Sequence, residues 1–168
     1  KDRIVSDCMR AWSGGETVDI RSPDATRPWQ HVLEPLSGYL TLGAELFQRT
    51  DYHGEAFNFG PSSNYNKSVR ELISMMGNYW ENIKWNDVSM NDGHPYEANL
   101  LKLNCDKALA HLNWKSALEF ENTVRMTVEW YKNYYQGERQ DMQEFTSSQI
   151  KEYMNLAKEK EILWAIEQ

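Results

Sequence analysis

The sequence predicts an α/β fold in which helices dominate and a few short strands form an open sheet. Apolar residues recur at helical spacing in several segments, and short runs typical of strands alternate singly with them. Single strands that alternate with helices favour an open sheet over a helical bundle. The 168 residues suffice for one domain with a hydrophobic core.

The first predicted element is a helix over 4–12, which the pair Gly14-Gly15 ends. A short strand follows over 18–20. Residues 22–30 then form a loop that two prolines hold.

The next helix begins near Pro35, a residue that the first turn of a helix tolerates, and runs to about Phe47. A strand over 56–59 follows and stops at Gly60. The residues of this helix that are expected to face inward are Leu36, Leu40, Leu42, Gly43 and Leu46.

Ser68 and Glu71 form a capping box, which predicts a helix to about Tyr79. Residues 83–88 are a weak strand candidate, and 89–96 are a polar loop. A further strand is expected over 100–103, before a short helix over 105–111 that Asn104 caps.

Two more capping boxes predict the last two helices, and the final one, over 147–166, presents a charged face that we interpret as solvated. The first box is Ser116 with Glu119, and its helix is expected to end at about Tyr135. The second box is Thr146 with Gln149, and its helix is expected to reach Ile166.

The net charge of −7 argues against a non-specific nucleic-acid or anionic-membrane surface, since both need basic patches. A local arginine cluster can still bind a small anion. No apolar run approaches the ~20 residues of a membrane span. Cys8 and Cys105 are too isolated for a disulfide framework or a metal cluster, so no metal is expected and a reduced, cytoplasmic setting is the simpler interpretation.

Arg27 is the first candidate binding residue, because a guanidinium beside a fixed aromatic ring can hold a diphosphate through a two-pronged contact. The alternative is a surface arginine paired with Asp24 or Glu34. Arg3 adds positive charge to the same anion site, or is simply solvated.

Trp29 and His31 are candidate pocket walls, although a tryptophan here also suits the core. Asn58 precedes a Gly-Pro turn of the kind where open α/β folds place ligands. Ser63 belongs to a polar segment that supplies groups for sugar or base hydroxyls, or that is a plain turn. His94 lies near Glu97, and a ligand contact or loop hydrogen bond is favoured over acid–base catalysis.

Several catalytic signatures are absent. The sequence contains no Gly-x-Gly-x-x-Gly turn, no phosphate-binding P-loop and no Tyr-x-x-x-Lys pair. We therefore assign no catalytic residue.

Several blocks resemble the CDP-glucose 4,6-dehydratases of the extended short-chain dehydrogenase/reductases, in the same order. The most specific is Ala-Thr-Arg-Pro-Trp-Gln-His-Val-Leu-Glu-Pro-Leu-Ser-Gly-Tyr-Leu at 25–40, and the others lie at 2–12, 57–61, 94–103 and 127–131. The resemblance implies the C-terminal portion of an NAD(P)-binding Rossmann-type fold, without the N-terminal dinucleotide-binding half. Residues 1–168 would be its nucleotide-sugar-binding part, with 34–60 packed on the missing domain.

The resemblance also implies a reaction in which CDP-glucose loses water to give CDP-4-dehydro-6-deoxyglucose, with NAD held by the N-terminal half. Arg27 would grip the diphosphate, Arg3 would contact the nucleotide, and Asn58 and Ser63 would reach it. The full-length enzyme would be a homo-oligomeric lyase of O-antigen dideoxyhexose biosynthesis. The fragment alone would be inactive and would expose apolar surface.

Two alternatives remain open at this point. One is a non-catalytic module that binds nucleotide sugars. The other is an epimerase or reductase of the same superfamily that acts on another nucleotide sugar. The Pro-Trp-Gln-His block at 28–31 favours the dehydratase over the second alternative.

Overall fold

The computed structural model describes residues 3–62, 66–90, 100–137 and 141–166. Short strands and longer helices alternate along this chain, as expected for a helix-rich α/β protein. The elements are α1 (Ile4–Ser13), β1 (Val18–Ile20), β2 (Thr26–Arg27), α2 (Leu33–Gln48), β3 (Lys67–Ser68), α3 (Val69–Met76), β4 (Trp85–Asp87), α4 (Asp106–Leu112), α5 (Phe120–Gln136), α6 (Met142–Glu159) and α7 (Leu163–Ile166).

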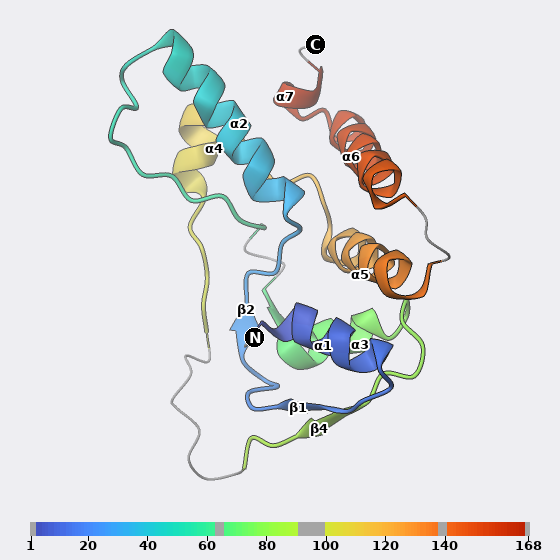
Figure 1. The fold of residues 1–168 in the computed structure, drawn as a ribbon. Helices are drawn as coiled ribbons and strands as arrows, with labels where there is room; N and C mark the ends of the chain where they lie inside the picture. Colours follow the sequence, from blue (N-terminus) through green and yellow to red (C-terminus); the bar gives the residue numbers. More distant parts are fainter. Residues whose placement is uncertain (1–2, 63–65, 91–99, 138–140, 167–168) are drawn as a thin grey trace.

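The described strands pair in two small sheets rather than one open sheet. β1 and β4 are parallel, with Val18 opposite Trp85, while β2 and β3 are antiparallel, with Arg27 opposite Lys67. Figure 1 shows α1 and α3 between the β1–β4 pair and α5, with α2 lying alongside α4 and with α6 and α7 forming a third group.

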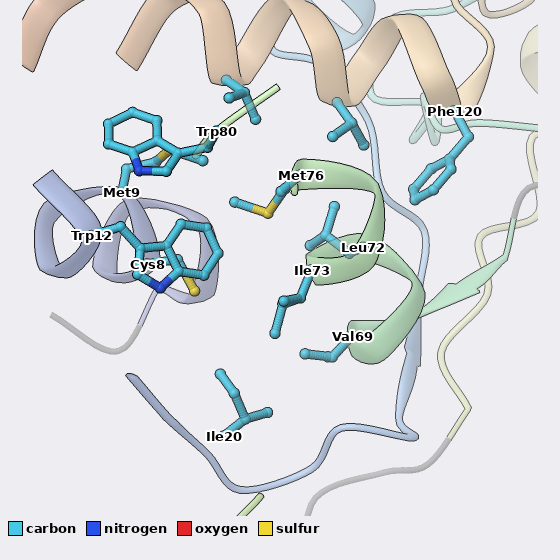
Figure 2. Packing of buried hydrophobic residues seen from close by; sticks show 12 residues of the cluster. Cys8, Met9, Trp12, Ile20, Val69, Leu72, Ile73, Met76, Trp80 and Phe120 are labelled. Carbon is cyan, nitrogen blue, oxygen red and sulfur yellow. The ribbon is translucent and has the colours of Figure 1, made fainter. Parts of the chain in front are cut away.

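The main core lies where α1, α3 and α5 meet. Cys8, Met9 and Trp12 of α1 are buried against the apolar face of α3, as Figure 2 shows. The indole Nε1 of Trp12 donates to the Lys84 carbonyl at 2.8 Å and so ties α1 to the segment that leads into β4. Ile20 of β1 closes this core from the sheet side.

The start of α3 confirms the predicted capping box. The Ser68 hydroxyl accepts from the Glu71 backbone N–H, and the Glu71 carboxylate accepts from the Ser68 N–H at 2.8 Å. The helix ends at Met76, slightly before the predicted end, and the chain continues in turns.

The predicted inward face of α2 is wrong for Leu36, Leu40 and Gly43, which are exposed. The residues that α2 buries instead are Glu34, Ser37 and Gly38. Glu34 and Ser37 are buried because they bond to residues far away in the sequence, and Gly38 is buried because it packs against the Phe59 ring. The spacing of apolar residues along the helix does not reveal either cause. One side of α2, which includes Leu36 and Leu40, is therefore exposed to solvent.

The strands predicted over 56–59 and 100–103 do not form. Residues 56–59 have no ladder partners, and Leu100 makes only an isolated bridge to Thr26. Conversely, the two-residue strand β2 forms within the predicted loop 22–30. It forms because this part of the loop pairs with β3, which lies some forty residues away in the sequence.

The two later capping boxes are also wrong, although both helices exist. α5 follows Glu119 without a side-chain cap. α6 begins at Met142, where the Asp141 side chain accepts from the backbone N–H groups of the first turn. The final helix breaks after Glu159, and Glu161 adopts a positive φ of 52° before α7.

A buried polar network joins α2 to the C-terminal half of the chain. The Glu34 carboxylate, 1% exposed, accepts from the peptide N–H groups of Ala117 and Leu118 at 2.6–3.1 Å and from the Tyr153 hydroxyl at 3.0 Å. The Ser37 hydroxyl accepts from the Trp114 indole at 3.0 Å. These bonds satisfy a carboxylate that would otherwise be costly to bury.

Among the described residues, no helix combines the length and the apolar character that crossing a membrane requires.

Candidate functional site

The segment from Thr26 to Leu33 connects the two features that make up the candidate site. Strand β2 places Arg27 opposite Lys67, and the chain then turns so that the Trp29 N–H donates to the Arg27 carbonyl at 2.9 Å. The Trp29 indole donates to the Lys67 carbonyl at 2.8 Å, which fixes the turn on β3. The proline between them supplies the restricted φ that this tight turn needs.

Arg27 is half-buried at this turn, and its Nη1 donates to the Thr26 carbonyl at 2.8 Å. The two carboxylates that the sequence offered as partners are engaged elsewhere. Asp24 pairs with Arg70 at 3.0 Å, and Glu34 accepts from peptide N–H groups in the core.

A shallow depression of about 10 Å³ lies beside this turn. Three segments far apart in the sequence supply its lining. The lining residues are Pro28, Pro61, Ser62, Asn66, Lys102 and Leu103.

The Asn66 side chain links two of the segments that line the depression. With its amide nitrogen facing the carbonyls of Arg27 and Leu101, at 3.2 and 3.3 Å, its oxygen accepts from the Thr26 hydroxyl at 3.1 Å. This amide therefore bridges β2 to the segment that carries Lys102.

Asn58 and Gly60 contact the segment that carries Lys102. The Asn58 side-chain amide donates to the Asn104 carbonyl at 3.1 Å. Gly60 approaches so closely that a Cβ there would lie 2.8 Å from Leu103 Cδ1. Asn58 itself does not line the depression; it lies three residues before the lining residue Pro61 and outside any strand.

Arg3 does not line the depression. Arg3 is exposed just before α1, where its backbone N–H donates to the Asp7 carboxylate at 3.0 Å. Ser63 and His94 lie outside the described residues.

Trp29 and His31 face a second, larger feature, a cavity of about 420 Å³. It is bounded by the 29–33 segment and by α1, α3, α5 and α6, and most of its lining is apolar. His31 is 7% exposed, and burial lowers its pKa from 6.5 to about 4. Its Nδ1 accepts from the Leu33 N–H at 3.3 Å, so the ring is neutral and ends the turn before α2.

The sequence pointed to Arg27, Trp29 and His31 and to the polar segment 62–66, which includes Asn66, but not to Lys102 as a binding residue. Asn66 and Lys102 reach the depression only through the β2–β3 pairing and the bridge of Leu100 to Thr26. No local motif marks such pairings. The buried Glu34 was missed as well, although a glutamate within an otherwise apolar segment is a signal for a buried polar role.

The depression offers chemistry for an anion. Lys102 lines it together with the side chains of Ser62 and Asn66, and Arg27 directly precedes the lining residue Pro28, in a chain whose net charge is −7. Within the described ranges, no cluster of three or more His, Cys, Asp or Glu side chains suits a metal ion. The sequence also lacks the glycine-rich turn that is typical of dinucleotide-binding sites.

Comparisons with known proteins bear on the family and the fold of the chain. No known protein-family profile matches the chain. Among solved structures, RMD from Pseudomonas aeruginosa in complex with NADPH superposes with a TM-score of 0.60 at 18% identity, over 80% of this chain and 44% of that one.

A curated relative covers nearly the whole chain. It is CDP-glucose 4,6-dehydratase of Salmonella typhimurium, which is 36% identical over 156 residues, or 92% of this chain. The chain spans 42% of that relative's length, in its C-terminal part. The resemblance expected from the sequence is therefore confirmed: this chain is a relative of the C-terminal part of CDP-glucose 4,6-dehydratase and has a short-chain dehydrogenase/reductase-type fold.

Proposed function

We propose that this chain is the nucleotide-sugar-binding part of an NAD-dependent CDP-glucose 4,6-dehydratase. The whole enzyme is a lyase that converts CDP-glucose to CDP-4-dehydro-6-deoxyglucose and water. The observation that carries the proposal is the 36% identity over 92% of the chain. The NADPH in the structural neighbour supports a nicotinamide cofactor for the whole enzyme.

Within this chain, Arg27 binds the diphosphate. It lies at the turn that β3 fixes, beside the depression that Ser62, Asn66 and Lys102 line. A guanidinium presents several donors in a fixed plane and so matches two phosphate oxygens at once. Lys102 adds a second cation, the Ser62 hydroxyl offers a hydrogen bond to the sugar or the base, and Asn66 holds the lining segments in place.

The cofactor binds outside this chain's residues, in the dinucleotide-binding portion of the whole enzyme. That portion also packs on residues 34–60. Support comes from α2, where Leu36 and Leu40 are exposed although they are large and apolar, and from Phe47, which is 91% exposed. A face of this kind normally marks an interface. The whole enzyme associates as a homo-oligomer.

Calorimetric titration tests the binding role. We expect CDP-glucose to bind the chain more tightly than dTDP-glucose, and Arg27→Ala to weaken binding by roughly 2–5 kcal/mol if the ion pair is desolvated. Arg27→Lys should recover only part of the loss, because an ammonium cannot make the planar two-pronged contact.

Arg10→Ala is the matched control, since Arg10 is an exposed arginine that pairs with Asp7 on α1. Its affinity for CDP-glucose should equal that of the unmodified chain. Equal affinity of the chain for the two nucleotide sugars would reject the cytidine assignment, and an unaffected Arg27→Ala variant would reject the role of Arg27.

A further inference from the structure

Lys102 lies in a segment that regular secondary structure does not hold. Residues 101–105 belong to no helix or strand, and they connect the isolated bridge at Leu100 to α4. Lys102 is exposed, yet it lines the same depression as Pro28, the residue that follows Arg27. The position of this lysine therefore depends on contacts that its segment makes with other parts of the chain.

Asn66 contacts the N-terminal side of this segment. In the orientation that satisfies both ends of its amide, the nitrogen donates to the carbonyls of Arg27 and Leu101 at 3.2 and 3.3 Å, and the oxygen accepts from the Thr26 hydroxyl. One side chain thus bonds to the backbone of Arg27 and to the peptide group directly before Lys102. The separation between these two stretches of backbone depends on this amide.

Two residues of a third segment contact the C-terminal side. The Asn58 side-chain amide donates to the Asn104 carbonyl at 3.1 Å. Gly60 packs so closely on Leu103 that an added Cβ would lie 2.8 Å from the leucine Cδ1. The backbone is therefore held on both sides of Lys102, by contacts one and two positions away.

We propose that Asn58 and Asn66 are positioning residues of the anion site, which hold the backbone on both sides of Lys102 so that this lysine and the turn at Arg27 face one diphosphate. The inference rests on the proposed function and deepens it. A segment that is ordered before the ligand arrives loses less conformational entropy on binding than a mobile segment does. Both asparagines thus raise the affinity without touching the ligand. For Asn58, this role differs from the direct nucleotide contact that the family resemblance implies.

A double-mutant cycle with CDP-glucose separates positioning from direct contact. Asn58→Leu removes the hydrogen-bond donor at nearly constant size, and we expect it to weaken CDP-glucose binding about three- to tenfold, the effect of one hydrogen bond. In a Lys102→Ala background the same substitution should weaken binding by less than about twofold, because the segment then carries no cation to position. A direct contact between Asn58 and the ligand would give the same loss in both backgrounds.

Backbone dynamics of the free chain give a second readout, which needs no ligand. NMR relaxation of the backbone amides should show restricted motion of residues 101–104 on the picosecond-to-nanosecond timescale. Asn58→Leu and Asn66→Ala should each increase that motion. Asn58 is exposed, so its variant keeps the core intact and decides the matter if Asn66→Ala fails to fold.

Asn86→Leu is the matched control. Asn86 is also exposed, and its side-chain amide likewise donates across the chain, to the Asp19 carboxylate at 3.0 Å. This variant should change neither the motion of residues 101–104 nor the affinity for CDP-glucose.

Equal losses for Asn58→Leu in the two backgrounds, or unchanged motion of residues 101–104 in that variant, would overturn the inference. If Lys102→Ala weakens binding and Asn58→Leu does not, the inference fails while the proposed function stands. If the chain does not bind CDP-glucose, or if neither Arg27→Ala nor Lys102→Ala changes the affinity, the proposed function fails and the inference fails with it.

Discussion

Glu34 illustrates how one residue organises the segment that follows Arg27. Its carboxylate accepts from two peptide N–H groups and one hydroxyl more than eighty positions along the chain, while its own N–H donates to the His31 carbonyl at 3.0 Å. Burial raises the pKa of this carboxyl, and the hydrogen bonds from Leu118, Ala117 and Tyr153 oppose that rise. The start of α2 is therefore fixed both to the preceding turn, through the His31 carbonyl, and to the C-terminal half of the chain, through the carboxylate.

Glu34→Leu should lower the free energy of unfolding by at least about 2 kcal/mol, because the N–H groups of Ala117 and Leu118 would lose their acceptor. Glu34→Gln should cost less, since one oxygen remains. Urea denaturation of the variants measures both effects. The matched control is Glu45→Leu on the more open side of α2, where a change within about 0.5 kcal/mol is expected. Equal losses at the two positions would contradict the role of Glu34.

His31 makes stability depend on pH. Its pKa in the folded chain is about 4 against 6.5 as the reference, so the unfolded chain takes up a proton first as the pH falls. The stabilisation from a neutral His31 is therefore present above pH 6.5 and is lost as the pH falls toward 4, by about 3 kcal/mol in total.

His31→Asn keeps an acceptor near the Nδ1 position but does not titrate, so its stability should fall about 3 kcal/mol less over this range. Urea midpoints at a series of pH values would show the difference. Both proteins retain Glu34, whose raised pKa acts in the opposite direction and cancels in the comparison. Parallel pH profiles would refute the assignment.

Two glycines on α2 separate close packing from helix propensity. A Cβ at Gly38 would overlap the Phe59 ring, with Cε1 at 2.8 Å, whereas a Cβ at Gly43 would meet nothing within 4 Å. Gly38→Ala should therefore destabilise the chain by about 1–3 kcal/mol through overpacking. Gly43→Ala should stabilise it by up to about 1 kcal/mol. Thermal denaturation of the pair gives the sign of each, and a stable Gly38→Ala variant would mean that α2 does not press on Phe59.

The same contrast between local and distant causes explains which elements the sequence predicted. The α3 capping box was predictable because Ser68 and Glu71 satisfy each other within one turn. The box assigned to Thr146 and Gln149 failed because both side chains serve α5: the Thr146 hydroxyl accepts from Trp130 and the Gln149 amide donates to Met126. Such contacts depend on tertiary packing, which residue spacing does not contain.

The candidate site divides in the same way. Arg27 and Trp29 were identifiable because a local motif carries them. Lys102 and Asn66 join them only because β2 pairs with β3 and because Leu100 bridges to Thr26. Trp29 and His31, which the sequence offered as walls of the anion pocket, line the large cavity instead. The other walls of this cavity come from helices whose apolar residues also suit an ordinary core, so the sequence did not reveal it.

At the scale of the whole molecule, the exposed apolar side of α2 should make the isolated chain prone to self-association. Leu40 is 77% exposed and Phe47 is 91% exposed, both within α2. We expect concentration-dependent self-association in analytical ultracentrifugation and binding of an apolar fluorescent dye. The double variant Leu40→Lys and Phe47→Lys should reduce both by several-fold.

Met90→Lys serves as the control, because Met90 is exposed to a similar degree outside α2. Its self-association should match that of the unmodified chain. A strictly monomeric chain without dye binding would argue against α2 as an interface.

The position of the nucleotide sugar can be measured most directly by NMR titration of the isotope-labelled chain with CDP-glucose. We expect saturable shifts of the backbone signals of Arg27, Ser62, Asn66 and Lys102, together with a change in the phosphorus resonances of the diphosphate that Arg27→Ala removes. Shifts centred on the α5–α6 side of the large cavity, or no saturable shift near Arg27, would contradict the proposal that this turn binds the diphosphate.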